Sequence, residues 1–151
     1  MTRIVVGSDA ATSVTTAVVD HLRATGAEVR VLGPTAGRPM GWVEVATGVA
    51  ETVVGGGADL GVLSCYTGTG VSIAANKVTG ARAALCVDAE TARGARRWND
   101  ANILVLSYRL TSDTVAREIT DAFLATSADP AEQPELDALA AYEAGRQGTG
   151  R

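Results

Sequence analysis

The sequence predicts one α/β domain, a three-layer α/β/α sandwich built on a five-stranded parallel, Rossmann-like sheet. Short apolar stretches alternate with helical patterns from residue 3 to about residue 126, which is typical of buried parallel strands joined by helices. A length of 151 residues suits one domain with a single core. The composition is 46% hydrophobic but only 4% aromatic, so Ala, Val, Leu and Ile must form most of that core.

The elements follow in order along this pattern. We expect strands at 4–7, 29–32, 60–65, 81–86 and 103–106, and helices at about 14–22, 42–54, 70–77, 89–97 and 112–124. Gly26 is expected to end the first helix, and a run of three glycines at 55–57 ends the second. Asp88 is an expected N-cap of the fourth helix, and Thr111 or Ser112 of the fifth.

The C-terminal part separates from this domain by composition. Residues 1–126 are expected to form the α/β domain, and 127–134 have the Ala, Asp and Pro content of a linker. A last helix at 135–144 is expected to pack on the domain or on a partner subunit through Leu136, Leu139 and Tyr142. The Gly-rich tail 145–151 is expected to be disordered.

Charge and composition exclude several classes of function. The formal net charge is −4 and no basic stripe is present, which argues against a nucleic-acid partner. The N-terminus runs directly into a strand, and no apolar run reaches the length of a membrane span, so we expect a cytoplasmic protein with no membrane partner. Two cysteines far apart and one histidine give no metal site, and no cofactor is expected.

The stretch from residue 60 to 77 carries the densest chemical signal. An apolar strand ends in Cys65, a loop of small and hydroxyl residues follows, and an Ala-rich helix begins. Ligands of open parallel sheets bind beyond the carboxyl ends of the strands, and amides of the loop 67–71 can hold an anion or oxyanion at the helix N-terminus. This pattern predicts Cys65 as a nucleophile or base and Thr67 as a hydrogen-bond donor. The alternatives are a buried apolar cysteine and a hydroxyl that satisfies the loop backbone.

The order and spacing of the motifs resemble the type B ribose-5-phosphate isomerases and the galactose-6-phosphate isomerase subunits. The resemblance covers about residues 3–126 and is far more specific than a lone glycine motif. The matching stretches are GSD at 7–9, CYTGTG at 65–70, SIAANK at 72–77, GARAALC at 80–86, ETAR at 90–93 and NDAN at 99–102.

The resemblance implies a cofactor-independent reaction in which a proton moves between adjacent carbons through an enediol. It assigns Cys65 as the base, and the loop amides hold the enediolate oxygen. It also implies homodimers or tetramers whose active sites lie at subunit interfaces, with a small carbohydrate as substrate. Expected substrate contacts are Asp9, Tyr66, Gly68, Thr69, Gly70, Asn99 and Arg109, together with Trp42 and Trp98 as ligand platforms or packing anchors. Asp9 is equally a candidate cap of the first helix.

Several positions depart from the family pattern. Ala10 and Trp98 stand where the family has histidines, the second of which is credited with ring opening, and Thr12 replaces a glycine. Positions near Glu132 and Leu136 take the place of two arginines that bind the substrate phosphate. The single histidine, His21, lies on the first predicted helix and replaces neither family histidine.

We therefore predict an aldose–ketose isomerase that uses Cys65 and acts on a substrate other than ordinary ribose 5-phosphate, such as one that is open-chain, shorter or unphosphorylated. Two alternatives remain open. One is a non-catalytic or partner-dependent subunit of a hetero-oligomeric isomerase. The other is an epimerase or dehydratase of a specialised pathway that keeps the proton-transfer chemistry.

Overall fold

The computed structural model describes residues 1–147 and contains the predicted five-stranded parallel sheet, in the order β2-β1-β3-β5-β4. The strands are β1 (Arg3–Ser8), β2 (Glu28–Leu32), β3 (Leu60–Cys65), β4 (Ala83–Leu85) and β5 (Ile103–Ser107). Ser8 pairs with Ser64, and Cys65 pairs with Ser107. The carboxyl ends of β1, β3 and β5 therefore lie side by side at one edge of the sheet, with β3 in the middle.

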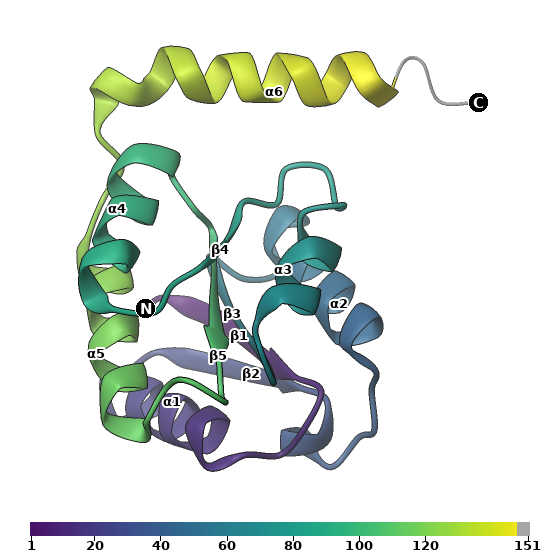
Figure 1. Cartoon of the computed structure of the whole chain (residues 1–151), viewed down its shortest axis with the longest axis vertical. Helices are drawn as coiled ribbons and strands as arrows, with labels where there is room; N and C mark the ends of the chain where they lie inside the picture. Colours follow the sequence, from purple (N-terminus) through teal and green to yellow (C-terminus); the bar gives the residue numbers. More distant parts are fainter. Residues whose placement is uncertain (148–151) are drawn as a thin grey trace.

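Helices cover both faces of the sheet, as the sequence predicts (Figure 1). On one face lie α1 (Ser13–Ala24), α4 (Ala89–Asn99) and α5 (Asp113–Ala125), and on the other lie α2 (Trp42–Val54) and α3 (Thr69–Ala75). Successive strand residues alternate between the two cores: Val62 packs with the first layer, whereas Leu63 and Cys65 pack with the second. The three-layer sandwich is confirmed.

Side chains start three helices where the sequence places them. The Asp88 carboxylate accepts a hydrogen bond from the Thr91 amide at 2.7 Å, and the Ser112 hydroxyl accepts one from the Val115 amide, so Ser112 is the cap of α5. The cap of α1 is Thr12, whose hydroxyl accepts from the Thr15 amide. The prediction that Asp9 caps α1 is therefore wrong, because the helix begins four residues later.

Strand β4 is shorter than the predicted 81–86. The Arg82 amide donates to the side-chain carbonyl of Asn102 at 2.7 Å instead of joining the strand ladder. At the outer side of β4, the Asn76 side chain accepts from the Ala83 amide at 2.8 Å and donates to its carbonyl at 2.9 Å. Asn76 thus ends α3 at Ala75, two residues before the predicted end, and occupies hydrogen-bonding groups that an edge strand would otherwise expose.

The C-terminal helix α6 (Gln133–Gln147) follows a 3-10 turn at Pro130–Glu132. It starts inside the predicted linker and passes the predicted end at 144, so residues 145–147 are helical; positions 148–151 of the expected tail lie outside the described residues. Figure 1 shows α6 set apart from the sheet and its covering helices. None of the helices described is long and apolar enough to cross a membrane.

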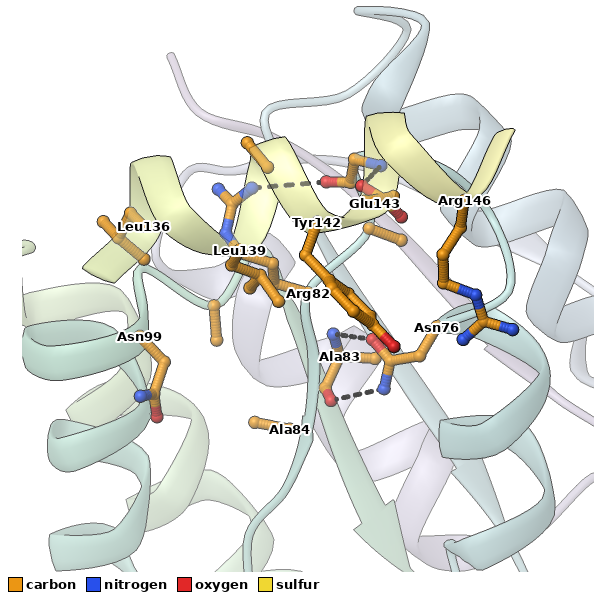
Figure 2. Close-up of a pocket in the computed structure, with 14 residues that line it drawn as sticks. Asn76, Arg82, Ala83, Ala84, Asn99, Leu136, Leu139, Tyr142, Glu143 and Arg146 are labelled. Atoms are coloured by element: carbon orange, nitrogen blue, oxygen red, sulfur yellow. Dashed lines mark hydrogen bonds between the residues drawn. The ribbon is translucent and has the colours of Figure 1, made fainter. Parts of the chain in front are cut away.

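A cavity of about 540 Å³ lies beneath α6, at the amino-terminal end of β4. The Glu143 carboxylate accepts a hydrogen bond from the Gly80 amide at 3.1 Å, and Tyr142 points toward Asn76 (Figure 2). Leu139 and Tyr142 remain 52% and 67% exposed, so α6 does not bury its apolar side chains on the sheet of its own chain. This cavity is at the opposite end of the sheet from Cys65.

Candidate active site

Cys65 ends the central strand β3, with its side chain turned toward α2 and α3. The residue is 6% exposed, and its sulfur accepts a hydrogen bond from the Gly68 amide at 3.2 Å. The thiolate is the form of cysteine that removes protons or attacks carbon. The thiol therefore lies just beneath the surface of the sheet edge where ligands of such folds bind.

The loop between Cys65 and α3 has a conformation that only glycine adopts without strain at position 68. Gly68 has φ +78°, and a Cβ built there would lie 2.5 Å from Cδ1 of Leu85 and 3.2 Å from the carbonyl oxygen of Leu106. The turn aims the Gly68 amide back at sulfur and starts α3 at Thr69. The next amides, 69–71, have no partner within the helix because they form its first turn. They belong to the amides 67–71 that the sequence predicts as donors to a developing oxyanion, whereas the Gly68 amide of that set donates to the Cys65 sulfur.

The two loop threonines form a pair at the surface. The hydroxyls of Thr67 and Thr69 lie 2.7 Å apart and share a hydrogen bond, and both residues are exposed. The Thr67 hydroxyl therefore bonds to another side chain. The alternative interpretation had it bond to the loop backbone. One hydroxyl of the pair keeps a proton that it can donate to a bound oxygen.

The end of β5 holds the peptide that follows the thiol. The Tyr66 carbonyl accepts hydrogen bonds from the Ser107 hydroxyl at 2.8 Å and the Arg109 amide at 3.0 Å. The Tyr108 amide donates to the Cys65 carbonyl at 3.2 Å. These three bonds fix the backbone directly after Cys65 and leave the Tyr66 side chain 58% exposed.

Tyr108 is a residue of this site that the sequence interpretation missed. Its hydroxyl donates to the Asp9 carboxylate at 3.2 Å, and its ring meets the Tyr66 ring edge-on, with centroids 6.0 Å apart. Burial raises the pKa of Tyr108, and the charges of Asp9 and Cys65 add to that effect. The signal for Tyr108 in the sequence is its place directly after the strand that neighbours β3.

The Trp42 ring packs beside the loop at Gly70. Trp42 begins α2, is 47% exposed, and lies so close to Gly70 that a Cβ there would be 3.1 Å from its ring. Gly70 therefore makes room for the indole beside the first turn of α3. Arg109, the predicted substrate contact that follows β5, is also exposed.

Trp98 and Asn99 do not join this cluster within one chain. Asn99 is the last residue of α4, beside the amino-terminal ends of β4 and β5, whereas Cys65 pairs with Ser107 at the far end of β5. At ~3.3 Å per strand residue, the two ends of β5 are about 13 Å apart, and Asn99 and Cys65 lie at opposite ends. Trp98 is 52% exposed and its ring covers Gly94, one turn earlier in α4.

Two other reactive residues are occupied by structural contacts. Nε2 of His21 on α1 lies 2.6 Å from the Asp121 carboxylate on α5. Cys86 is fully buried, and burial, followed by the Asp88 charge, raises the pKa of its thiol to about 11. Cys86 is therefore protonated and unreactive at neutral pH, as a buried apolar cysteine should be.

Comparison with known proteins identifies the group of enzymes to which this site belongs. The family model of the ribose/galactose isomerases matches residues 4–138. The chain belongs to the ribose/galactose isomerase family. Members of this family are sugar-phosphate aldose–ketose isomerases, so the chain is an enzyme of that class. This confirms the family and the reaction class predicted from the motifs between residues 7 and 102.

Two curated isomerases of this family are similar over most of their length. Ribose-5-phosphate isomerase B of Escherichia coli is 36% identical over 127 residues, covering 83% of this chain and 85% of that protein. The D-erythrulose-4-phosphate isomerase of Pectobacterium atrosepticum is 34% identical over 147 residues, covering 95% and 96%. The names of these two relatives thus refer to different sugar phosphates.

Solved structures of ribose/galactose isomerases share the fold. Ribose-5-phosphate isomerase B of Clostridium thermocellum superposes with a TM-score of 0.90 at 34% identity, over 95% of this chain and 99% of that one. The Mycoplasma genitalium enzyme, solved with bound ribulose 5-phosphate, gives a TM-score of 0.86 at 35% identity over 93% and 95%. Nearly the whole fold of these ribose-5-phosphate isomerases is therefore present in this chain.

Proposed function

We propose that this isomerase interconverts a short, acyclic aldose phosphate and its ketose by proton transfer through Cys65, with D-erythrulose 4-phosphate as the leading substrate. The observation that carries this is Trp98, which takes the place of the family histidine credited with ring opening. A substrate that never forms a ring does not need that histidine.

The chemistry of a four-carbon sugar phosphate agrees with this loss. A furanose ring of a tetrose needs the oxygen on carbon 4, and the phosphate ester occupies it. The tetrulose has no further hydroxyl that could close a ring on its carbonyl. The similarity of this chain to the D-erythrulose-4-phosphate isomerase, over 95% of its length, supports the same substrate.

The Cys65 thiolate removes the proton from the carbon next to the carbonyl, and the electron pair forms the enediolate. The amides 69–71 and the Thr67–Thr69 hydroxyl pair lie on the loop that follows the thiol and stabilise the negative oxygen. Cys65 then returns the proton to the adjacent carbon, and the proton of the original hydroxyl passes to the original carbonyl oxygen, so that the carbonyl and hydroxyl groups exchange places. No oxidant or reductant is consumed, and a general base placed in this way contributes about 10²–10⁴-fold to the rate.

We further infer that the active enzyme is a homodimer with shared sites. Asn99 and Trp98 lie at the opposite end of the sheet from Cys65 and can reach a thiol only in a second copy. Half-exposed Trp98 and the exposed Leu139 and Tyr142 of α6 give apolar surface for that contact. A closed pair of identical chains would hold two such sites.

Solvent deuterium tests the proposed reaction. Purified enzyme in D₂O should incorporate deuterium next to the carbonyl of D-erythrulose 4-phosphate, with a higher kcat/KM than for ribose 5-phosphate. Cys65→Ala should lower kcat by about 10²–10⁴-fold, and Cys86→Ala is the matched control because its thiol is buried and protonated. Full activity of Cys65→Ala would exclude this mechanism.

Complementation tests the shared site. Cys65→Ala chains mixed with Asn99→Ala chains should form hybrid dimers with one intact site each. Random pairing puts half of the dimers in this class, so about a quarter of wild-type activity should return. Activity that appears only with a different protein would instead favour a hetero-oligomeric subunit, and a product other than the aldose would favour epimerase or dehydratase chemistry.

A further inference from the structure

The hydrogen bond between Tyr108 and Asp9 crosses over the end of the strand that carries the thiol. Asp9 follows β1 and Tyr108 follows β5, and β3 lies between these two strands in the sheet. The two residues are 99 positions apart in sequence. The phenol and the carboxylate therefore form a bridge from one neighbour of β3 to the other, next to Cys65.

Tyr108 is held firmly enough to position another side chain. Its amide is bonded to the Cys65 carbonyl, its ring packs against the core on the α1 side of the sheet, and the Tyr66 ring supports it edge-on at 6.0 Å. Among the residues described, its hydroxyl is the one group that hydrogen-bonds to the Asp9 side chain. The bond uses Oδ1 of Asp9, so Oδ2 keeps its accepting capacity.

We propose that Tyr108 is a positioning residue that fixes the Asp9 carboxylate beside Cys65, so that Oδ2 of Asp9 accepts a hydrogen bond from a hydroxyl of the bound sugar phosphate. The role rests on the proposed function and adds the element that orients the substrate. Because this hydroxyl is away from the two reacting carbons, its bond is the same in the ground state and the transition state. Loss of such a bond raises KM and leaves kcat nearly unchanged.

Tyr108→Phe tests this role, since it keeps the ring and the Tyr66 contact and removes only the hydroxyl. We expect KM for D-erythrulose 4-phosphate to rise about 10-fold, in line with the loss of one charge-assisted hydrogen bond, with kcat within about 3-fold of wild type. Thr25→Val is the control, because it removes a hydroxyl that is hydrogen-bonded to the Leu22 carbonyl at the end of α1, away from the site. A merely structural role of Tyr108 would lower the melting temperature without separating KM from kcat.

A double-mutant cycle with Asp9→Asn shows whether Tyr108 acts through Asp9. The double variant should have the KM of Asp9→Asn alone, whereas independent roles would multiply the two effects. Calorimetric binding of 3-phospho-D-glycerohydroxamate, an inert mimic of the enediolate, gives a readout without turnover and should weaken about 10-fold in Tyr108→Phe.

The outcomes separate this inference from the proposed function. If wild-type enzyme turns over the substrate and Tyr108→Phe has unchanged KM and unchanged probe affinity, the positioning role is wrong and the function stands. If wild-type enzyme neither turns over the tetrulose phosphate nor binds the probe, the proposed substrate fails and this role fails with it.

Discussion

Substitution of Gly68 by Ala should destabilise the protein more than a glycine change of the same backbone type elsewhere. Gly68 has φ +78°, where an L side chain costs about 1–2 kcal/mol. Its new Cβ would also lie 2.5 Å from the Leu85 side chain and 3.2 Å from the Leu106 carbonyl. Overpacking of this kind costs about 1–3 kcal/mol, which gives a total of about 2–5 kcal/mol.

Gly26→Ala is the matched control because it isolates the backbone cost. Gly26 has φ +89°, and nothing lies within 4 Å of a Cβ built there. Only the first contribution, about 1–2 kcal/mol, should therefore appear. The difference between the two variants measures the contact of position 68 with Leu85 and Leu106.

Urea unfolding followed by circular dichroism gives both free energies of unfolding. Gly68→Ala should exceed Gly26→Ala by about 1–3 kcal/mol, and an excess near 2 kcal/mol corresponds to about 4–8 °C in melting temperature for a chain of this length. Equal losses in the two variants would refute the reasoning, because the loop would then move without cost and would not hold its amide against the Cys65 sulfur.

Three further outcomes are expected. Burial raises the pKa of Cys86 from near 9 in the unfolded chain to about 11, so the folded state binds more protons between these two values. Stability should therefore fall by up to about 3 kcal/mol as pH rises through this window, and Cys86→Ala should lack that loss in urea melts. His21→Gln should keep wild-type kcat/KM, because its ring bonds to Asp121 on α5; a large loss would place a histidine in the reaction. Gly70→Ala should displace the Trp42 ring and change the near-ultraviolet circular dichroism spectrum, while the free energy of unfolding stays within ~1 kcal/mol of wild type. An unchanged spectrum would contradict the contact.

The sequence predicted the regular parts of the fold well because their signals are local. The bounds of β3 and α2 agree with the structure, since an apolar strand and an amphipathic helix each carry their own periodicity. The length of β4 was overestimated because the Arg82 amide bonds to the side chain of Asn102, 20 residues further along the chain, instead of joining the strand ladder. Apolar character alone does not show such competition.

The site was predictable where it lies on one continuous stretch. Cys65 ends one strand and Thr67 and Gly68 follow it directly, so their geometry is local. The Tyr108–Asp9 contact required the strand order, which places β1 and β5 on either side of β3 and which no local pattern states. The sequence pattern of α6 predicted a helix but not the surface that the helix covers, because an apolar helix face can pack on many different surfaces.

The placement of Asn99 shows how topology corrects a motif. In a parallel α/β fold, helices begin near the carboxyl ends of the strands and end near the amino ends. A residue that ends a helix therefore lies opposite a residue that ends a strand, as Asn99 and Cys65 do. Two motifs of the same family need not lie close together within one chain.

At Tyr66 the backbone aligns the thiol, whereas the side chain is available to select the substrate. The Tyr66 carbonyl is held by Ser107 and Arg109, while its side chain is largely in solvent. Residue identity at 66 can therefore vary without moving the thiol. A library of substitutions at this one position should yield isomerases that differ in the sugars they accept and share one proton-transfer step, which makes position 66 a practical starting point for redesign of the enzyme.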